Sequence, residues 1–256
     1  MTLPDTRRYD GGFYADHAES SLRSAAVVLP IIYEVFRPES VIDIGCGQGR
    51  WLAAAEAAGS TTLTGLDGPW VDPKAMHSPR IDFRPTDLTG AISIDRRYDL
   101  CVSVEVAEHL PPPCAESFVD ALCRASDVVL FSAAVPNQGG TEHVNEERAS
   151  RWAARFESRG HACFDLIRGR VWEDARVDWW YRQNAFVYVA RRSPRFATFA
   201  ALPLPAAPRD LVHPDAFESK VAWLEAERAR LQRRADRPTL GAAMRGLWRA
   251  LTARGD

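Results

Sequence analysis

The sequence predicts an α/β fold, in which a mostly parallel sheet carries helices on both faces and a helical extension follows at the C-terminus. Three observations support this prediction. Short apolar runs alternate with helical runs through the first 200 residues, which is the order expected when helices connect parallel strands. A glycine-rich turn joins the first of these apolar runs to a helical one. A Pro/Ala-rich stretch then separates a basic segment from the rest of the chain.

Each expected element is recognised by its composition. Five apolar or β-branched runs predict strands over residues 40–45, 61–67, 81–87, 98–106 and 127–135. Three stretches of helical composition lie over residues 50–59, 114–126 and 147–161. Two further runs, joined by a tight return that makes one of them antiparallel, predict strands over residues 161–167 and 184–192. The domain is therefore expected to hold seven strands in one sheet.

The composition is that of a globular protein. The 256 residues are 46% hydrophobic and 26% charged, which is enough to build a core without disulfides. A formal net charge of −2 argues against general nucleic-acid binding. The longest apolar run, residues 25–32, is too short to cross a bilayer, and the N-terminus lacks the apolar segment of a signal peptide. Five cysteines without a Cys-x-x-Cys pair predict a reducing, cytoplasmic compartment.

Charge and composition divide the chain into three parts. We expect a domain over residues 1–200, a Pro/Ala-rich linker over 201–214 and an amphipathic basic helical tail over 215–256. Residues 220–256 carry a formal net charge of +5, which leaves −7 on residues 1–219. Apolar residues recur at helical spacing in the tail, at positions 217, 221, 224 and 231, and again at 240, 244, 247 and 251. Such a tail is expected to lie on an anionic membrane, to dock on a partner enzyme, or to pack on the domain.

The clearest motif is the glycine-rich turn VIDIGCGQGRW, residues 41–51. Its glycines are Gly45, Gly47 and Gly49. A glycine turn between a strand and a helix lets main-chain amides approach a ligand closely. The spacing differs from the dinucleotide-binding fingerprint, whose third glycine would fall at Arg50. Acids precede the turn and end the second and third strands, at the same expected edge of the sheet; these are Asp43, Asp67 and Asp87.

The order of these motifs resembles that of the class I S-adenosylmethionine-dependent methyltransferases, over roughly residues 35–190. The resemblance implies a Rossmann-like, seven-stranded, mostly parallel sheet with helices on both faces, and S-adenosylmethionine as the cofactor. It also assigns cofactor contacts to Asp43, Gly45, Gly47, Asp67, Asp87, Leu88 and Glu105. The first three would hold the methionine part, and Asp67 the ribose. Asp87 with Leu88 would contact the adenine edge, and the chain at Glu105 would pass under the sulfonium.

A second group of polar residues follows the fourth and fifth strands. Glu105, Glu108 and His109 have the spacing i, i+3, i+4, which places them on one face of a helical turn, and His143 follows the fifth strand. Because ligands bind at the carboxyl edge of open α/β sheets, these four side chains are expected to converge and to hold Mg²⁺ or Mn²⁺. The Glu-x-x-Glu-His pattern is similar to that of the small-RNA 3′-terminal 2′-O-methyltransferases and the ubiquinone-pathway O-methyltransferases, in which it implies a metal beside the acceptor hydroxyls.

The same group predicts catalysis on a hydroxyl. An aliphatic hydroxyl is a weak nucleophile until its proton leaves; a metal can acidify that proton and a nearby histidine can accept it. We therefore expect His143 and Glu105 to act in catalysis. The alternative is a metal-free site in which the Glu–His pair only orders its loop.

Aromatic and amide side chains gather before the last strand and predict the acceptor. They are Trp172, Trp179, Trp180, Tyr181, Arg182, Gln183 and Asn184. Flat rings beside hydrogen-bonding groups suit a polyhydroxylated acceptor, although the same rings would also serve as core. Residues 137–161 look like methyltransferases of bacterial polysaccharide and glycoside pathways. The predicted reaction is therefore methylation of a sugar or glycan hydroxyl.

Three other functions stay open at this point. The first is methylation of a small aromatic or quinone-type hydroxyl, and the second is a non-catalytic, cofactor-binding scaffold that recruits partners through its tail. The third is RNA 3′-end methylation. The charge of −7 on residues 1–219 argues against it, because phosphate binding needs a basic groove. We therefore expect no specific nucleic-acid partner.

Overall fold

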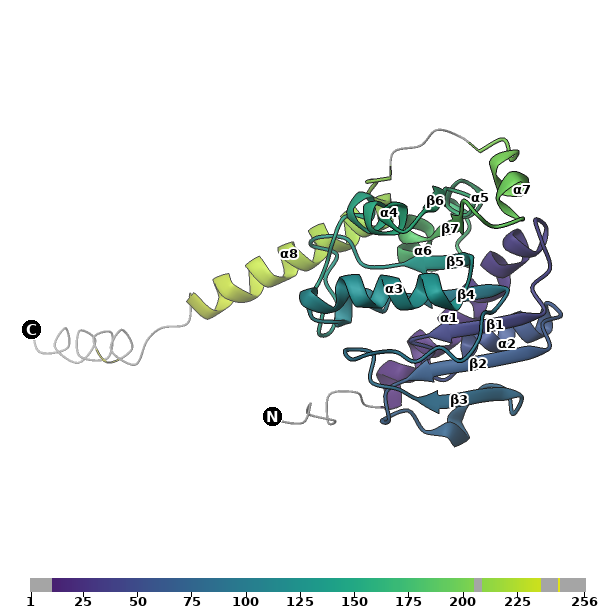
Figure 1. The fold of residues 1–256 in the computed structure, drawn as a ribbon. Coiled ribbons are helices and arrows are strands. Elements are labelled where there is room, and N and C mark those ends of the chain that lie inside the picture. The colour runs from purple at the N-terminus through teal and green to yellow at the C-terminus, as the bar shows by residue number, and fades with distance from the viewer. Residues whose placement is uncertain (1–10, 205–208, 236–243, 245–256) are drawn as a thin grey trace, which may run out of the picture. The chain divides into compact units, whose positions relative to one another are not determined.

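The computed structural model describes residues 11–204, 209–235 and 244. The chain divides into two compact units, residues 1–213 and 214–256, and each is described by itself. The first unit holds the sheet and the helices around it (Figure 1). In the second unit, the described part is essentially one helix, α8 (Pro214–Ala235).

The first unit is built on a seven-stranded sheet in the order β3-β2-β1-β4-β5-β7-β6 (Figure 1). β7 is antiparallel to both of its neighbours, and the other pairs are parallel. The strands are β1 (Ser40–Ile44), β2 (Thr62–Asp67), β3 (Ile81–Pro85), β4 (Leu100–Val104), β5 (Val128–Ser132), β6 (His161–Phe164) and β7 (Phe186–Ala190). This arrangement confirms the predicted α/β fold with a mostly parallel sheet.

The connection between the last two strands differs from the prediction. β6 and β7 do pair antiparallel, with His161 opposite Ala190. No tight return joins them, however, because residues 165–185 intervene and contain the helices α5 (Arg168–Val171) and α6 (Trp179–Asn184). β6 is also shorter than the predicted strand over 161–167, since Leu166 and Ile167 are buried in the core instead of extending β6.

Helices cover both faces of the sheet. They are α1 (Gly11–Tyr33), α2 (Arg50–Ala57), α3 (Ala115–Ala125), α4 (Ala149–Ser158) and α7 (Phe196–Ala200), with short 3₁₀ turns η2 (Pro73–Ala75), η3 (Ala107–His109) and η4 (Pro112–Cys114). Buried residues of α1, α2 and α7 belong to one core cluster, and those of α3 and α4 belong to the other. The two clusters lie on opposite faces, as the alternation along each strand requires.

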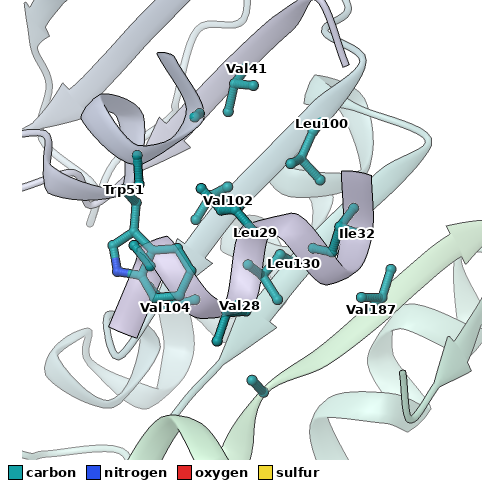
Figure 2. Packing of buried hydrophobic residues seen from close by; sticks show 14 of the residues in the cluster. Val28, Leu29, Ile32, Val41, Trp51, Leu100, Val102, Val104, Leu130 and Val187 are labelled. Carbon is teal, nitrogen blue, oxygen red and sulfur yellow. The ribbon is translucent and has the colours of Figure 1, made fainter. Parts of the chain in front are cut away.

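β4 shows this alternation most clearly. Leu100, Val102 and Val104 join the α1 cluster, whereas Cys101 joins the α3 cluster. Figure 2 shows Val102 facing Leu29 of α1. Because both faces are covered, the strand is apolar throughout, and each fully buried aliphatic side chain contributes about 1.5–3 kcal/mol. The rigid sheet fixes the positions of the loops that leave its carboxyl edge.

Residues 209–213, the last residues of the first unit, lie within the segment that the sequence predicts to be a linker. Residues 209–213 are bonded to the sheet domain: Ser150 Oγ donates to Asp210 at 2.7 Å, and the His213 main-chain N–H donates to the Gln183 side chain at 2.7 Å. His213 itself is only 3% exposed. The segment therefore packs on the domain before α8 begins.

In α8, the expected apolar stripe is present on a helix, and Phe217, Leu224 and Leu231 are exposed. The second amphipathic segment expected from position 240 lies outside the described residues, apart from Met244. No helix in the described part of the chain combines the length and apolar character needed to cross a bilayer.

Candidate active site

The glycine turn after β1 is shaped by left-handed backbone. Gly45, Gly47 and Gly49 have φ angles of 91°, 51° and 76°, a region that favours glycine. A Cβ on Gly45 would lie 2.3 Å from Val106 Cγ2, so this glycine lets the loop after β4 approach. A Cβ on Gly47, by contrast, would have no atom of the described residues within 4 Å, apart from the neighbouring residues in the chain. The turn therefore presents main chain to open space at the carboxyl edge of the sheet.

Asp67, at the end of β2, holds the glycine turn in place. Its carboxylate accepts the main-chain N–H of Gly47 and that of Gly68, each at 2.7 Å. Burial raises the pKa of Asp67, and these two hydrogen bonds oppose the rise. Each carboxylate oxygen has a second lone pair, so Asp67 keeps acceptor capacity for a ligand hydroxyl.

Asp43 lies beneath the turn and is unsatisfied. It is only 1% exposed, and its Oδ1 has no hydrogen-bond partner among the described residues. Burial raises the pKa of Asp43 well above its usual range, and the charge of Asp67 adds to the effect. A buried oxygen without a donor costs free energy, so Asp43 is suited to a ligand that brings a donor to it.

The third acid is placed differently. Asp87 is exposed, and it accepts hydrogen bonds from the main-chain N–H and the hydroxyl of Thr89, at 2.9 and 2.7 Å. These bonds lower the pKa of Asp87 and fix the turn after β3. The side chain of Leu88 points into the core, so any cofactor contact at this position would come from its main chain.

Glu105 opens the loop after β4 in a strained conformation. Its φ is 53°, and its main-chain N–H donates to Ser132 O at 3.0 Å. Its carboxylate accepts the side-chain amides of Gln138 at 3.1 Å and Asn184 at 3.3 Å. Burial raises the pKa of Glu105, and hydrogen bonds from Ser132, Asn184 and Gln138 oppose it. The side chain is thus fixed in an amide network.

Glu108 is the unsatisfied partner of Glu105. It is fully buried in η3, and neither of its carboxyl oxygens has a hydrogen-bond partner among the described residues. Burial raises the pKa of Glu108 well above its usual range, with the neighbouring charge of Glu105 acting in the same direction. Burial and the neighbouring carboxyl therefore both favour the protonated form of Glu108.

Two histidines complete this cluster. The ring centroids of His109 and His143 are 4.8 Å apart. Glu108, His109 and His143 each offer one atom that could bind a metal, and these three atoms all lie within 4.8 Å of one another. His109 keeps an exposed surface, and partial desolvation of its ring lowers its pKa, with the charge of His143 acting in the same direction. The structure therefore brings these three side chains together, and the carboxyl of Glu105 lies beside that of Glu108.

Glu105 is not one of these three mutually close ligand residues, although its carboxyl interacts with that of Glu108, and the expected helical i, i+3, i+4 spacing does not hold here. That expectation assumed helical backbone from residue 105, whereas η3 begins only at Ala107 and Glu105 is left-handed. Its side chain consequently turns toward Gln138 and Asn184.

Two residues that the sequence analysis missed position His143 and Glu105. Glu146 accepts a hydrogen bond at 3.0 Å from Nδ1 of His143, and Glu146 is held by the main-chain N–H groups of Asn137 and Gly139. Gly140 has a φ of 152°, and a Cβ there would lie 2.3 Å from His143 Nε2. The second missed residue is Gln138, which bonds Glu105. The i, i+3 spacing of His143 and Glu146 was a usable signal for the first.

The aromatic stretch before β7 is partly structural. Tyr181 is buried against Trp51, with 5.3 Å between ring centroids, and burial raises the pKa of Tyr181 to about 12. Arg182 donates to the main-chain oxygen of Trp172 at 3.0 Å. The rings of Trp172, Trp179 and Trp180 are only partly buried. The polar groups of this stretch therefore brace the segment, and those three rings keep exposed surface.

Comparison with known proteins identifies a family and a fold. A family model described as a methyltransferase domain matches residues 19–182. No curated protein sequence gives a significant match. Among solved structures, the plantazolicin methyltransferase BpumL in complex with SAH is similar, with a TM-score of 0.53 and 16% identity over 74% of this chain and 92% of that one.

Two further structures are similar at the same level. The complex between the Haloferax volcanii Trm112 methyltransferase activator and a methyltransferase gives a TM-score of 0.52 and 16% identity, over 74% of this chain and 99% of that one. The magnesium protoporphyrin IX methyltransferase of Synechocystis, with bound SAM, gives 0.50 and 14% identity, over 71% and 85%. At these identities the similarity establishes the fold, which is Rossmann-like.

Proposed function

The chain belongs to the methyltransferase domain family, and on this premise we propose that it transfers a methyl group from S-adenosylmethionine to a hydroxyl of a sugar or glycan. The observation that supports a hydroxyl acceptor is the cluster of Glu108, His109 and His143, whose ligand atoms lie within 4.8 Å of one another. An aliphatic hydroxyl, unlike a phenol or an amine, needs a group that removes its proton before it can attack, and this cluster supplies such groups.

The glycine turn and its two acids fit the cofactor. The buried Oδ1 of Asp43 has no donor among the described residues, and the ammonium group of a methionine moiety would supply one. Asp67 retains lone pairs for ribose hydroxyls after accepting the amides of Gly47 and Gly68. Asp87 and Leu88 follow β3, where the adenine edge is expected. The contact of Leu88 would be through its main chain.

The second cluster fits a divalent metal. Both oxygens of Glu108 lack a partner among the described residues, and the two imidazoles lie beside them. One carboxylate with two imidazoles favours Mn²⁺ over Mg²⁺, since Mg²⁺ prefers oxygen ligands. When bound, such a metal would lower the pKa of the acceptor hydroxyl. Glu105 would lie outside the ligand set and support the loop through Gln138 and Asn184.

Glu146 orients the imidazole ring of His143 through a hydrogen bond. Because a carboxylate can only accept, Nδ1 of His143 carries the proton in that 3.0 Å bond, and the lone pair of the neutral ring lies on Nε2. That lone pair is available to the metal or to the proton of the hydroxyl. The Trp172, Trp179 and Trp180 rings, which are partly exposed, would cover the apolar faces of a sugar.

The decisive experiment compares turnover with cofactor binding. We expect His143→Ala to reduce methyl transfer by about 10²–10⁴-fold while the dissociation constant of S-adenosylmethionine stays within about twofold. Transfer of a labelled methyl group to a panel of glycosides, catechols and quinols identifies the acceptor, with EDTA as a parallel arm. Unchanged turnover in the variant would remove His143 from the mechanism. Methylation of quinols alone would replace the sugar as acceptor, and EDTA-insensitive turnover would remove the metal.

A further inference from the structure

Residues 209–213, which we call the strap, are bonded to helices of the sheet domain. The main-chain oxygen of Arg209 accepts a hydrogen bond from the Arg168 guanidinium at 3.0 Å. The Asp210 carboxylate accepts the main-chain N–H of Ser150 at 3.0 Å. These two bonds attach the start of the strap to α5 and α4. The strap is therefore part of the folded domain, and its last residue lies at a defined place beside α6.

That last residue, His213, reaches the interior. Its ring centroid lies 4.5 Å from that of Trp172, and its Nε2 lies 2.9 Å from the main-chain oxygen of Trp172. Its main-chain N–H donates to Oε1 of Gln183 at 2.7 Å. Because a main-chain N–H can only donate, this bond fixes which end of the Gln183 amide faces the strap.

The orientation of Gln183 is passed on to Glu105 through Asn184. With its oxygen on the strap, Gln183 directs its NH₂ group to Oδ1 of Asn184, at 2.9 Å. The NH₂ group of Asn184 then donates to Oε1 of Glu105 at 3.3 Å and to Oε1 of Gln138 at 2.9 Å. Gln138 donates in turn to the other oxygen of Glu105, at 3.1 Å. A continuous series of hydrogen bonds therefore runs from the strap to the Glu105 carboxylate.

Burial makes the direction of these bonds depend on the strap. Gln183 is 1% exposed and Asn184 is 3% exposed, so water does not replace a lost partner. Without the N–H of His213, Oε1 of Gln183 would be a buried acceptor that lacks a donor. Turning that amide around would set its oxygen against Oδ1 of Asn184, and turning Asn184 as well would set oxygen against the Glu105 carboxylate. The N–H of His213 selects the one arrangement in which every oxygen meets a donor.

The turn that Glu105 opens needs such support. Its φ of 53° is left-handed, and this conformation persists at a non-glycine residue only where the surroundings fix it. η3 follows directly and carries Glu108 and His109. A shift of Glu105 would therefore move both of these residues. The amides that reach Glu105 from α6 lie beyond residues 19–182, which the family model matches, so this support is additional to the matched domain.

We propose that the strap positions the Glu105 carboxylate and the left-handed turn that carries it. The main-chain N–H of His213 does so through the amides of Gln183 and Asn184. Gln183 is thus a positioning residue for the acceptor side of the site, because it acts through Asn184. The inference rests on the proposed function, in which the residues of η3 serve the acceptor.

The first test separates turnover from cofactor binding in two variants of Gln183. Gln183→Met removes both hydrogen bonds, and we expect kcat to fall by about 10–100-fold. The dissociation constant of S-adenosylmethionine should stay within about twofold. Gln183→Glu keeps an acceptor for the strap and loses the donor to Asn184. If Gln183 only anchored the strap, this variant would keep its activity, whereas we expect kcat to fall as far as in Gln183→Met.

The second test isolates the N–H group of His213. His213→Ala and His213→Pro both remove the imidazole ring, but only proline also lacks the N–H. We expect His213→Ala to keep kcat within about threefold and His213→Pro to lose about as much as Gln183→Met. All variants are compared in the full chain, below the midpoint of their thermal unfolding. Equal kcat values for the two His213 variants would overturn the proposal, as would wild-type turnover in Gln183→Glu.

NMR spectroscopy of the full chain gives a readout that does not depend on turnover. In Gln183→Met, the side-chain NH₂ resonances of Gln138 and the main-chain amide resonance of Glu105 should shift, and in His213→Ala they should not. Resonances that stay in place in Gln183→Met would overturn the proposal. If they shift while the wild type methylates no acceptor, the positioning series is present and the proposed function is wrong.

Discussion

The two halves of the candidate active site each contain a pair of acids, in which a partly buried acid is satisfied and a fully buried acid is not. Asp67 accepts two main-chain amides, whereas Asp43 beside it has an oxygen without a donor. Glu105 accepts two side-chain amides, whereas both oxygens of Glu108 lack a donor. In each half, the satisfied acid fixes a loop and the unsatisfied acid is left for a ligand.

The halves differ in which groups donate hydrogen bonds to the satisfied acid. The donors to Asp67 belong to Gly47 and Gly68, which are main chain of the adjoining turns. The donors to Glu105 include the side chains of Gln138 and Asn184, which are far away in sequence. The proposed cofactor half, which contains Asp43 and Asp67, is therefore set by local backbone, and the proposed acceptor half, which contains Glu105 and Glu108, depends on tertiary packing. We expect substitutions in the two halves to separate cofactor affinity from turnover.

The largest effect is expected at the unsatisfied acid of the acceptor half. Glu108→Gln should lower turnover by about 10²–10⁴-fold, because an amide can neither hold a proton for transfer nor neutralise a cation. The dissociation constant of S-adenosylmethionine, measured by calorimetry, should stay within about twofold. If cofactor affinity fell together with turnover, the two halves would not be independent.

The next effect concerns the backbone of the cofactor half. Gly45→Ala should reduce the free energy of unfolding by about 2–4 kcal/mol, because the new Cβ would meet Val106 at 2.3 Å while φ stays at 91°. Gly59→Ala is the control: its φ is 111°, and no described neighbour lies within 4 Å of the new Cβ. Chemical denaturation should show a loss of only about 1 kcal/mol there. Equal losses would mean that the contact with Val106 is unimportant.

The smallest effect is the pH dependence of stability from Asp43. The pKa of folded Asp43 lies above the unfolded value of about 3.9, so between these values the folded protein holds a proton that the unfolded chain releases. The free energy of unfolding therefore falls as the pH rises through this window. In the protein without cofactor, Asp43→Asn should remove part of that fall and raise stability at pH 8 by about 1 kcal/mol.

Asp67→Asn is the matched comparison for this measurement. An asparagine has one acceptor oxygen for two amide donors and would turn its own NH₂ group toward the other, so thermal unfolding should show a loss of about 1–3 kcal/mol. Destabilisation by both substitutions to the same extent would contradict the distinction between satisfied and unsatisfied acids.

The same difference explains what could be predicted from the sequence. The strands, the glycine turn and the places of Asp43 and Asp67 follow from local patterns of apolar residues, glycines and acids, and the sheet confirms the expected order of strands and helices. The amide network around Glu105 could not be predicted, since it depends on segments that meet only in the folded chain. The conformation of Glu105 was missed for another reason: a left-handed φ at a glutamate has no sequence signal.

The antiparallel strand β7 limits where the chain can accept an inserted residue. Phe186 and Tyr188 belong to one core layer, and Val187 and Val189 to the other. Adding one residue inside β7 would exchange these layers, displace Asn184 at one end and shift Arg192 at the other. The longer crossing that precedes the strand, residues 165–185, can absorb a change in length that β7 cannot. Length variation should therefore be tolerated better in that crossing than in β7.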